Sequence, residues 1–125
     1  VFLENGDSEV TAASWYGAVM KPLTVDLKLK ERETTIAIGD GEVTAIHWPG
    51  HSPGSIVLTT CIEDQLVLFG QDVHGPLDPS LLSHREDYVK SLNLLLSLES
   101  DILCEGHFGI FRGKEEVANF IRSFL

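Results

Sequence analysis

The sequence predicts an α/β fold in which antiparallel strands come first along the chain and two helices lie toward its C-terminal end. Two pairs of β-type runs are each joined by a tight turn, and two later segments carry apolar residues at helical spacing. A length of 125 residues with 43% hydrophobic residues is typical of one globular domain and not of a disordered chain. We therefore treat residues 1–125 as a single unit.

The N-terminal segment has the least regular pattern. Residues 1–23 mix small, aromatic and apolar side chains without a clean period, and we interpret them as a short helix plus a loop. From Thr24 to Lys30, apolar residues alternate with charged ones. This period of two predicts a strand that is buried on one face.

A first pair of strands follows this segment. Residues 34–38 and 42–48 flank Gly39-Asp40-Gly41, whose glycines permit the positive φ angles of a tight turn. Residues 49–54 contain two prolines and two glycines, which exclude regular structure there.

A second pair of strands comes after this loop. Residues 55–60 and 65–70 are joined across Glu63-Asp64. We expect the four strands of the two pairs to lie side by side in antiparallel order.

The chain then changes to helical spacing. Residues 83–86, Ser-His-Arg-Glu, have the Ser-x-x-Glu pattern of a capping box, and we expect a helix from about Glu86 to Leu98. A short strand is expected at residues 101–104, followed by a last helix from about Lys114. The apolar faces of the two helices are Tyr88, Leu92, Leu95 and Leu96, and Val117, Phe120, Ile121 and Phe124.

The composition excludes several kinds of partner. Nineteen Asp and Glu residues against nine Lys and Arg give a formal charge of −10, which disfavours a nucleic-acid or anionic-membrane surface. No apolar stretch approaches the roughly 18 residues of a spanning helix. We expect a cytoplasmic protein with a small-molecule substrate and without nucleic-acid or membrane partners. Cys61 and Cys104 lie among apolar neighbours and are interpreted as reduced core cysteines.

Three polar residues follow predicted strands and are candidates for chemistry. His51 lies in the loop at residues 49–54, Asp72 follows the strand at residues 65–70, and His107 follows the strand at residues 101–104. Imidazoles and a carboxylate at strand ends suit zinc, iron or manganese, with room for an activated water. The alternative is that Asp72 caps a turn and the histidines are ordinary loop residues, and the spacing alone leaves both interpretations open.

Three motifs carry a resemblance to a known family. The octet Trp48-Pro49-Gly50-His51-Ser52-Pro53-Gly54-Ser55, the run Leu68-Phe69-Gly70-Gln71-Asp72 and the triplet Glu105-Gly106-His107 resemble, in order and spacing, the later motifs of the metallo-β-lactamase superfamily. The usual middle motif is Gly-Asp, and here Gln71 intervenes. The resemblance implies that the chain is the C-terminal portion of an αββα sandwich.

The resemblance also implies metal ligands and a reaction. His51 matches a ligand of the first metal, Asp72 the catalytic carboxylate that bridges both metals, and His107 a ligand of the second metal. The expected cofactor is zinc, binuclear in the complete protein, with iron or manganese as alternatives. The expected function is a metal-dependent hydrolase in which a metal-activated water attacks a thioester, ester or lactone of a small molecule. Thioester hydrolysis, as in glyoxalase II-like members, is favoured.

One motif of the family is missing from the chain. The H-x-H-x-D-H motif should lie upstream, but no histidine precedes His47, so each metal would have at most two protein ligands. We therefore expect the chain alone to bind metal weakly and to be inactive. The absence of an initial Met favours the C-terminal portion of a longer enzyme, which would associate with the missing N-terminal half or form a homo-oligomer. The alternative is a naturally short chain, a non-catalytic subunit or interaction domain of the same fold.

Other residues near the motifs have two interpretations each. His74 is either a substrate contact or a loop histidine that stabilises the Gly75-Pro76 turn. Trp48 and Phe108 could form an apolar wall for substrate, but core packing is the preferred role of both. We expect His47 and His84 at the surface, and name Trp15 and Tyr16 as residues that could contribute to the pocket.

Overall fold

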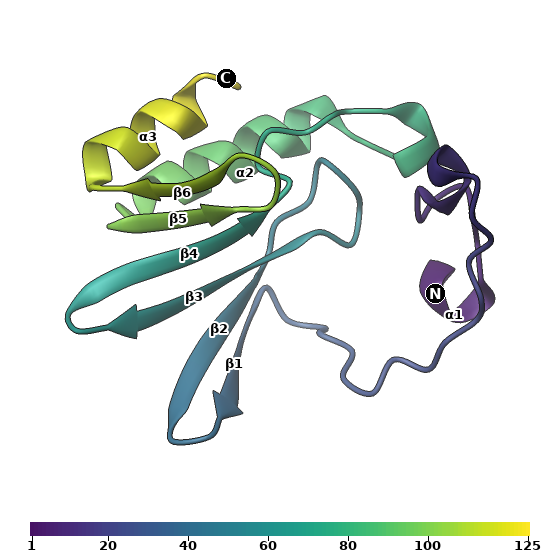
Figure 1. Cartoon of the computed structure of the whole chain (residues 1–125), viewed down its shortest axis with the longest axis horizontal. Helices are drawn as coiled ribbons and strands as arrows, with labels where there is room; N and C mark the ends of the chain where they lie inside the picture. Colours follow the sequence, from purple (N-terminus) through teal and green to yellow (C-terminus); the bar gives the residue numbers. More distant parts are fainter.

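The structure is a computed structural model that describes residues 1–125, and it consists of one six-stranded sheet with helices on one face (Figure 1). The strands follow one another across the sheet in sequence order. All neighbours are antiparallel except β4 and β5, which run parallel. The strands are β1 (Glu33–Ile38), β2 (Gly41–His47), β3 (Ile56–Ile62), β4 (Gln65–Gln71), β5 (Ile102–Glu105) and β6 (Gly109–Arg112).

Two helices cover one face of this sheet. Helix α2 (Arg85–Ser97) connects β4 to β5, and α3 (Lys114–Arg122) follows β6 (Figure 1). The connection through α2 is what allows β4 and β5 to run parallel, because parallel neighbours require a long crossover. The core between the sheet and the helices contains Ile46, Trp48, Val57, Leu68, Val73, Tyr88, Leu92, Leu95, Leu103, Val117 and Ile121.

The predicted α/β class, the four antiparallel strands and both C-terminal helices are confirmed. In the turn of the second hairpin, Glu63 and Asp64 both have positive φ angles, of 51° and 62°. Such a turn matches the twist of the two strands that it joins. Strand β6 was not predicted and β5 ends one residue later than expected, because four-residue strands are too short to show a period.

The strand expected from Thr24 to Lys30 is wrong. The N-terminal part contains only the short helix α1 (Phe2–Asn5) and the 3-10 helix η1 (Ala13–Tyr16), and residues 24–30 have no regular structure. Their alternating pattern has no partner, because β1 pairs only with β2 and no other strand lies on that side of the sheet. A strand needs a neighbour to satisfy its backbone hydrogen bonds, whatever its side-chain period.

The capping box expected at Ser83 is also wrong. Helix α2 begins one residue earlier than expected, with His84 at its N-cap and no side-chain cap. The Ser83 hydroxyl instead donates to the carbonyl oxygen of His51 at 2.5 Å. The sequence pattern was correct for a helix start, but a long-range contact occupies the serine.

The cysteine interpretation is wrong for Cys61, which is exposed near the end of β3, and Cys104 is partly buried in β5. The thiols of both residues are free. Of the helices, none is both long and apolar enough to cross a membrane.

Tyr88 carries a testable consequence of burial in the core. Its hydroxyl donates to the carbonyl oxygen of Val73, and its ring packs edge-on against Trp48. Burial raises the pKa of Tyr88 to about 12, with Arg85 opposing and Glu105 adding to the shift. In the unfolded chain, the Tyr88 hydroxyl would lose its proton near pH 10. The folded state retains the proton longer, so Tyr88 contributes stability below pH 10 that is lost as the pH rises from 10 to 12.

We expect this loss to be about 3 kcal/mol of unfolding free energy. A Tyr16→Phe variant leaves Tyr88 as the only tyrosine, so its ultraviolet absorbance should show one titration near pH 12. Urea unfolding of this variant and of Tyr88→Phe between pH 9 and 12 measures the difference. A tyrosine that titrates near pH 10 in the folded Tyr16→Phe protein would contradict the prediction.

Candidate metal centre

The parallel pairing of β4 and β5 brings two of the predicted site residues together. Asp72 directly follows β4, and His107 comes two residues after β5. The backbone N–H of Gly106 donates to the carbonyl oxygen of Gln71 at 2.8 Å, which joins the two strand ends. A Cβ on Gly106 would lie 2.9 Å from that oxygen, so glycine is required for this close approach.

The loop that carries His51 is held by residues in α2 and directly before it. The Ser91 hydroxyl donates to the carbonyl oxygen of Pro49 at 2.7 Å. The backbone N–H of His84 donates to the carbonyl oxygen of Gly50 at 2.8 Å. With the bond from Ser83 to His51, three consecutive carbonyl groups of the loop have partners from this one region. The loop thus has a defined position although it has no secondary structure.

Asp72 lies between His51 and His107. Its Oδ2 is 3.4 Å from Nε2 of His51, and its Oδ1 is 2.8 Å from Nε2 of His107. On the far side of the first ring, Nδ1 of His51 lies 2.7 Å from the carbonyl oxygen of Pro76. A carbonyl can only accept, so this contact assigns the proton of His51 to Nδ1 and leaves Nε2 free toward Asp72.

A buried carboxylate lies behind this group. Glu105, the last residue of β5, has no exposed side-chain surface, and its Oε1 is 2.6 Å from Nδ1 of His74. Its Oε2 accepts from the backbone N–H groups of His107 at 2.7 Å and Phe108 at 2.9 Å. Burial acts to raise the pKa of Glu105, but the hydrogen bonds from His74, His107 and Phe108 outweigh it, so the pKa lies below its usual value.

The two aromatic residues that flank the site differ in their environments. Trp48 is 1% exposed, so core packing is confirmed for it. Core packing is wrong for Phe108, which is 61% exposed. Its ring contacts His74 edge-on, with centroids 4.9 Å apart, so it borders the site. Both residues lie in or next to the motifs, and only the tertiary structure distinguishes their environments.

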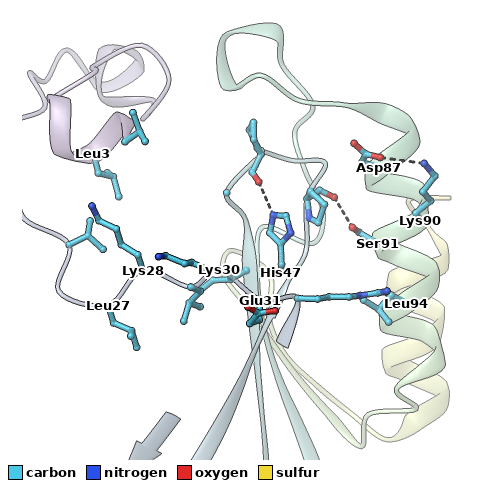
Figure 2. Close-up of a pocket in the computed structure, with 18 residues that line it drawn as sticks. Leu3, Leu27, Lys28, Lys30, Glu31, His47, Asp87, Lys90, Ser91 and Leu94 are labelled. Atoms are coloured by element: carbon cyan, nitrogen blue, oxygen red, sulfur yellow. Dashed lines mark hydrogen bonds and ion pairs between the residues drawn. The ribbon is translucent and has the colours of Figure 1, made fainter. Parts of the chain in front are cut away.

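The predicted site residues share one cavity. A cavity of about 360 Å³ is lined by His51, Asp72, His74 and His107, and by Trp15 and Tyr16 from the N-terminal segment. A larger cavity lies between residues 25–32, the 49–54 loop and α2, and it contains none of these four residues (Figure 2). In that cavity, Nε2 of His47 lies 2.8 Å from the carbonyl oxygen of Pro53. The surface positions expected for His47 and His84 are confirmed.

The donor set fits a transition metal. Asp72, His74 and His107 each offer one ligand atom, and these three atoms lie within 4.8 Å of one another. Imidazole nitrogen and carboxylate oxygen are ligands of zinc, iron and manganese in proteins. Neither the pairing of Glu105 with His74 nor a ligand role of His74 was predicted from the sequence. The available signals were the Asp-x-His spacing and the acidic residue two positions before His107.

No protein-family model matches the chain, but curated proteins and solved structures do. The chain is 33% identical over 107 residues to acyl-coenzyme A thioesterase MBLAC2 of Gallus gallus, and 33% identical over 132 residues to that of Bos taurus. A metallo-β-lactamase from Cronobacter sakazakii has a similar fold, with a TM-score of 0.70, 18% identity and coverage of 98% of this chain and 57% of that one. The chain belongs to the metallo-β-lactamase superfamily.

The alignments cover only part of each relative's length. They cover 78% and 95% of the chain, but only 37% and 46% of the Gallus gallus and Bos taurus relatives. The chain therefore spans less than half the length of these curated relatives. A class B3 di-zinc metallo-β-lactamase from an Alaskan soil metagenome is 23% identical with a TM-score of 0.64, and the match covers 85% of this chain and 44% of that structure. The metallo-β-lactamase fold that the motifs predicted is confirmed by these matches.

Proposed function

We propose that this chain carries part of the active site of a metal-dependent hydrolase that cleaves acyl thioesters of small molecules. The observation that carries the proposal is the position of Asp72, whose two carboxylate oxygens face different imidazoles, those of His51 and His107. A carboxylate with one oxygen toward each of two nitrogen ligands is suited to bridge two metal ions. The metallo-β-lactamase fold and the hydrolase relatives support the reaction class.

The residues of the site would act by holding metal and substrate in place. His51, Asp72 and His107 would hold zinc, with iron or manganese as alternatives. When bound, such ions lower the pKa of a coordinated water and polarise the carbonyl under attack. The bond to Pro76 orients His51 with Nε2 toward the site, and Glu105 orders the backbone of His107. Phe108, Trp15 and Tyr16 provide aromatic surface near the site for an acyl group.

The thioester preference rests on the relatives, which are named acyl-coenzyme A thioesterases. Hydrolysis of a thioester adds the oxygen of water to the acyl carbon, breaks the carbon–sulfur bond and releases a carboxylic acid and a thiol. The thiol allows a direct assay. The substrate is proposed to be a small molecule, without nucleic-acid or membrane partners, because the chain is strongly acidic.

We propose further that residues 1–125 form a single unit that pairs with the remaining part of the fold. On the sheet face opposite the helices, Phe69 is 40% exposed and its neighbour across β5, Ile110, is 59% exposed. An apolar sheet face of this kind favours association. The relatives, which are more than twice as long as the aligned part, support an N-terminal half as the occupant, with a second copy of this chain as the alternative.

Chelation tests the hydrolase proposal. We expect the gene product that contains this chain to release thiol from an acyl-coenzyme A, to lose at least about 90% of that activity after treatment with a strong chelator, and to regain it when zinc is added. Chelator that was first saturated with zinc is the control. Hydrolysis that persists without metal would overturn the proposal. Metal binding without any hydrolysis would support the non-catalytic alternative.

A further inference from the structure

We propose that His74 is the third protein ligand of a metal site that is complete within this chain, formed with Asp72 and His107 and oriented by the buried Glu105. The proposal rests on the proposed function, since it shares two residues with that site. It adds a ligand that the motifs did not indicate and assigns a positioning role to Glu105.

The backbone places His74 beside Asp72. Val73, between them, is fully buried in the core. The residues on both sides of it, Asp72 and His74, line the same cavity. The backbone N–H of Gly75 donates to the carbonyl oxygen of Asp72 at 3.0 Å, which closes a tight turn around this pair. The spacing Asp-x-His thus delivers two donor groups to one place.

The ring of His74 also lies beside that of His107. The two ring centroids are 5.0 Å apart and the rings meet edge to face. The ligand atoms of Asp72, His74 and His107 lie within 4.8 Å of one another. Atoms bound to one tetrahedral zinc at about 2.1 Å would be about 3.4 Å apart. A small movement of the side chains is therefore sufficient to bring all three onto one ion.

Glu105 fixes the state of His74. Because a buried carboxylate accepts at 2.6 Å from Nδ1, that nitrogen carries the proton and Nε2 is left with its lone pair. A histidine that donates from one nitrogen to a carboxylate and binds metal with the other is a recurrent arrangement in zinc sites. The same carboxylate accepts from the backbone of His107, so one side chain positions two of the three ligands.

The negative charge of Glu105, which three hydrogen-bonding residues already stabilise, would also be favourable for a cation bound to His74. Its carboxylate has no exposed surface, and no Lys or Arg forms an ion pair with it. A buried negative charge is costly unless a positive charge or hydrogen bonds compensate for it. A metal ion on His74 would supply a positive charge one imidazole away. With His74 included, the ligand count rises from two to the three that catalytic zinc sites use.

Metal titration of the 125-residue chain tests the inference. We expect one Co²⁺ per chain, with visible absorption from a nitrogen and oxygen ligand set, and competition by one Zn²⁺. His74→Ala should lower zinc affinity by about 100-fold or more, and Glu105→Gln by roughly 10- to 100-fold, the range for partners behind a ligand. His84→Ala, an exposed histidine outside the site, is the matched control and should leave affinity unchanged.

Two further variants make the result decisive. His51→Ala should retain the one bound metal, because His51 is not part of the proposed three-ligand set. If Glu105→Gln fails to fold, as judged by circular dichroism, His74→Gln replaces it, since glutamine can still donate to Glu105. Unchanged zinc affinity in a folded His74→Ala or His74→Gln protein would overturn the inference, as would loss of the bound metal in His51→Ala. Metal binding with this profile but no hydrolysis by the gene product would count against the proposed function alone.

Discussion

Replacement of Asp72 by asparagine should lower thioester hydrolysis by more than about 100-fold, because loss of a partner behind a metal ligand already costs roughly 10- to 100-fold. Asparagine retains the shape of the side chain but removes the negative charge between His51 and His107. The site then loses the one group whose two oxygens face both imidazoles. The measurement is thiol release from an acyl-coenzyme A by the gene product that contains this chain, with zinc in excess.

The matched control for this change is Asp40→Asn. Asp40 lies at the exposed tip of the β1–β2 hairpin, away from the cavity that contains Asp72. Its substitution should leave hydrolysis unchanged. If Asp72→Asn retained the activity of the Asp40→Asn protein, Asp72 would not be a ligand and the proposed function would lose its main support.

Replacement of Gly50 by alanine should destabilise the fold by about 3 kcal/mol or more, at or beyond the upper end of the usual cost of overpacking. Gly50 has a φ of 135°, and a Cβ there would lie 2.3 Å from the backbone nitrogen and Cα of Tyr88. Neither the 49–54 loop nor α2 can move away without breaking the hydrogen bonds that join them. One of these bonds runs from the backbone N–H of His84 to the carbonyl oxygen of Gly50. The next residue is His51, so any folded variant should also place this imidazole differently relative to Asp72.

Gly54→Ala in the same loop is the control. A Cβ at Gly54 would meet nothing within 4 Å. Its substitution should change stability by less than about 1 kcal/mol, the range of the propensity difference between glycine and alanine. Urea unfolding of the two variants and the parent chain gives the comparison. Equal stabilities for Gly50→Ala and Gly54→Ala would show that the contact with Tyr88 does not constrain the loop.

The elements that local chemistry specifies were predicted well from the sequence. The glycines at the first hairpin turn, the turn-bounded β-type runs of β1 to β4 and the helical spacing in α2 and α3 each act over a few residues. Two predictions failed where the outcome depends on a distant partner. Residues 24–30 have a strand pattern but no strand beside them, and Ser83 bonds to His51 instead of capping α2.

By itself, the sequence determined which residues could carry chemistry, since the motifs around His51, Asp72 and His107 are local and their order along the chain is visible. The tertiary structure decided which residues meet. The parallel pairing of β4 with β5 places Asp72 beside His107, and it also brings Glu105 to His74 across 31 residues. No local period records such a contact, because it is made by the crossover through α2 and by the core that holds α2 against the sheet.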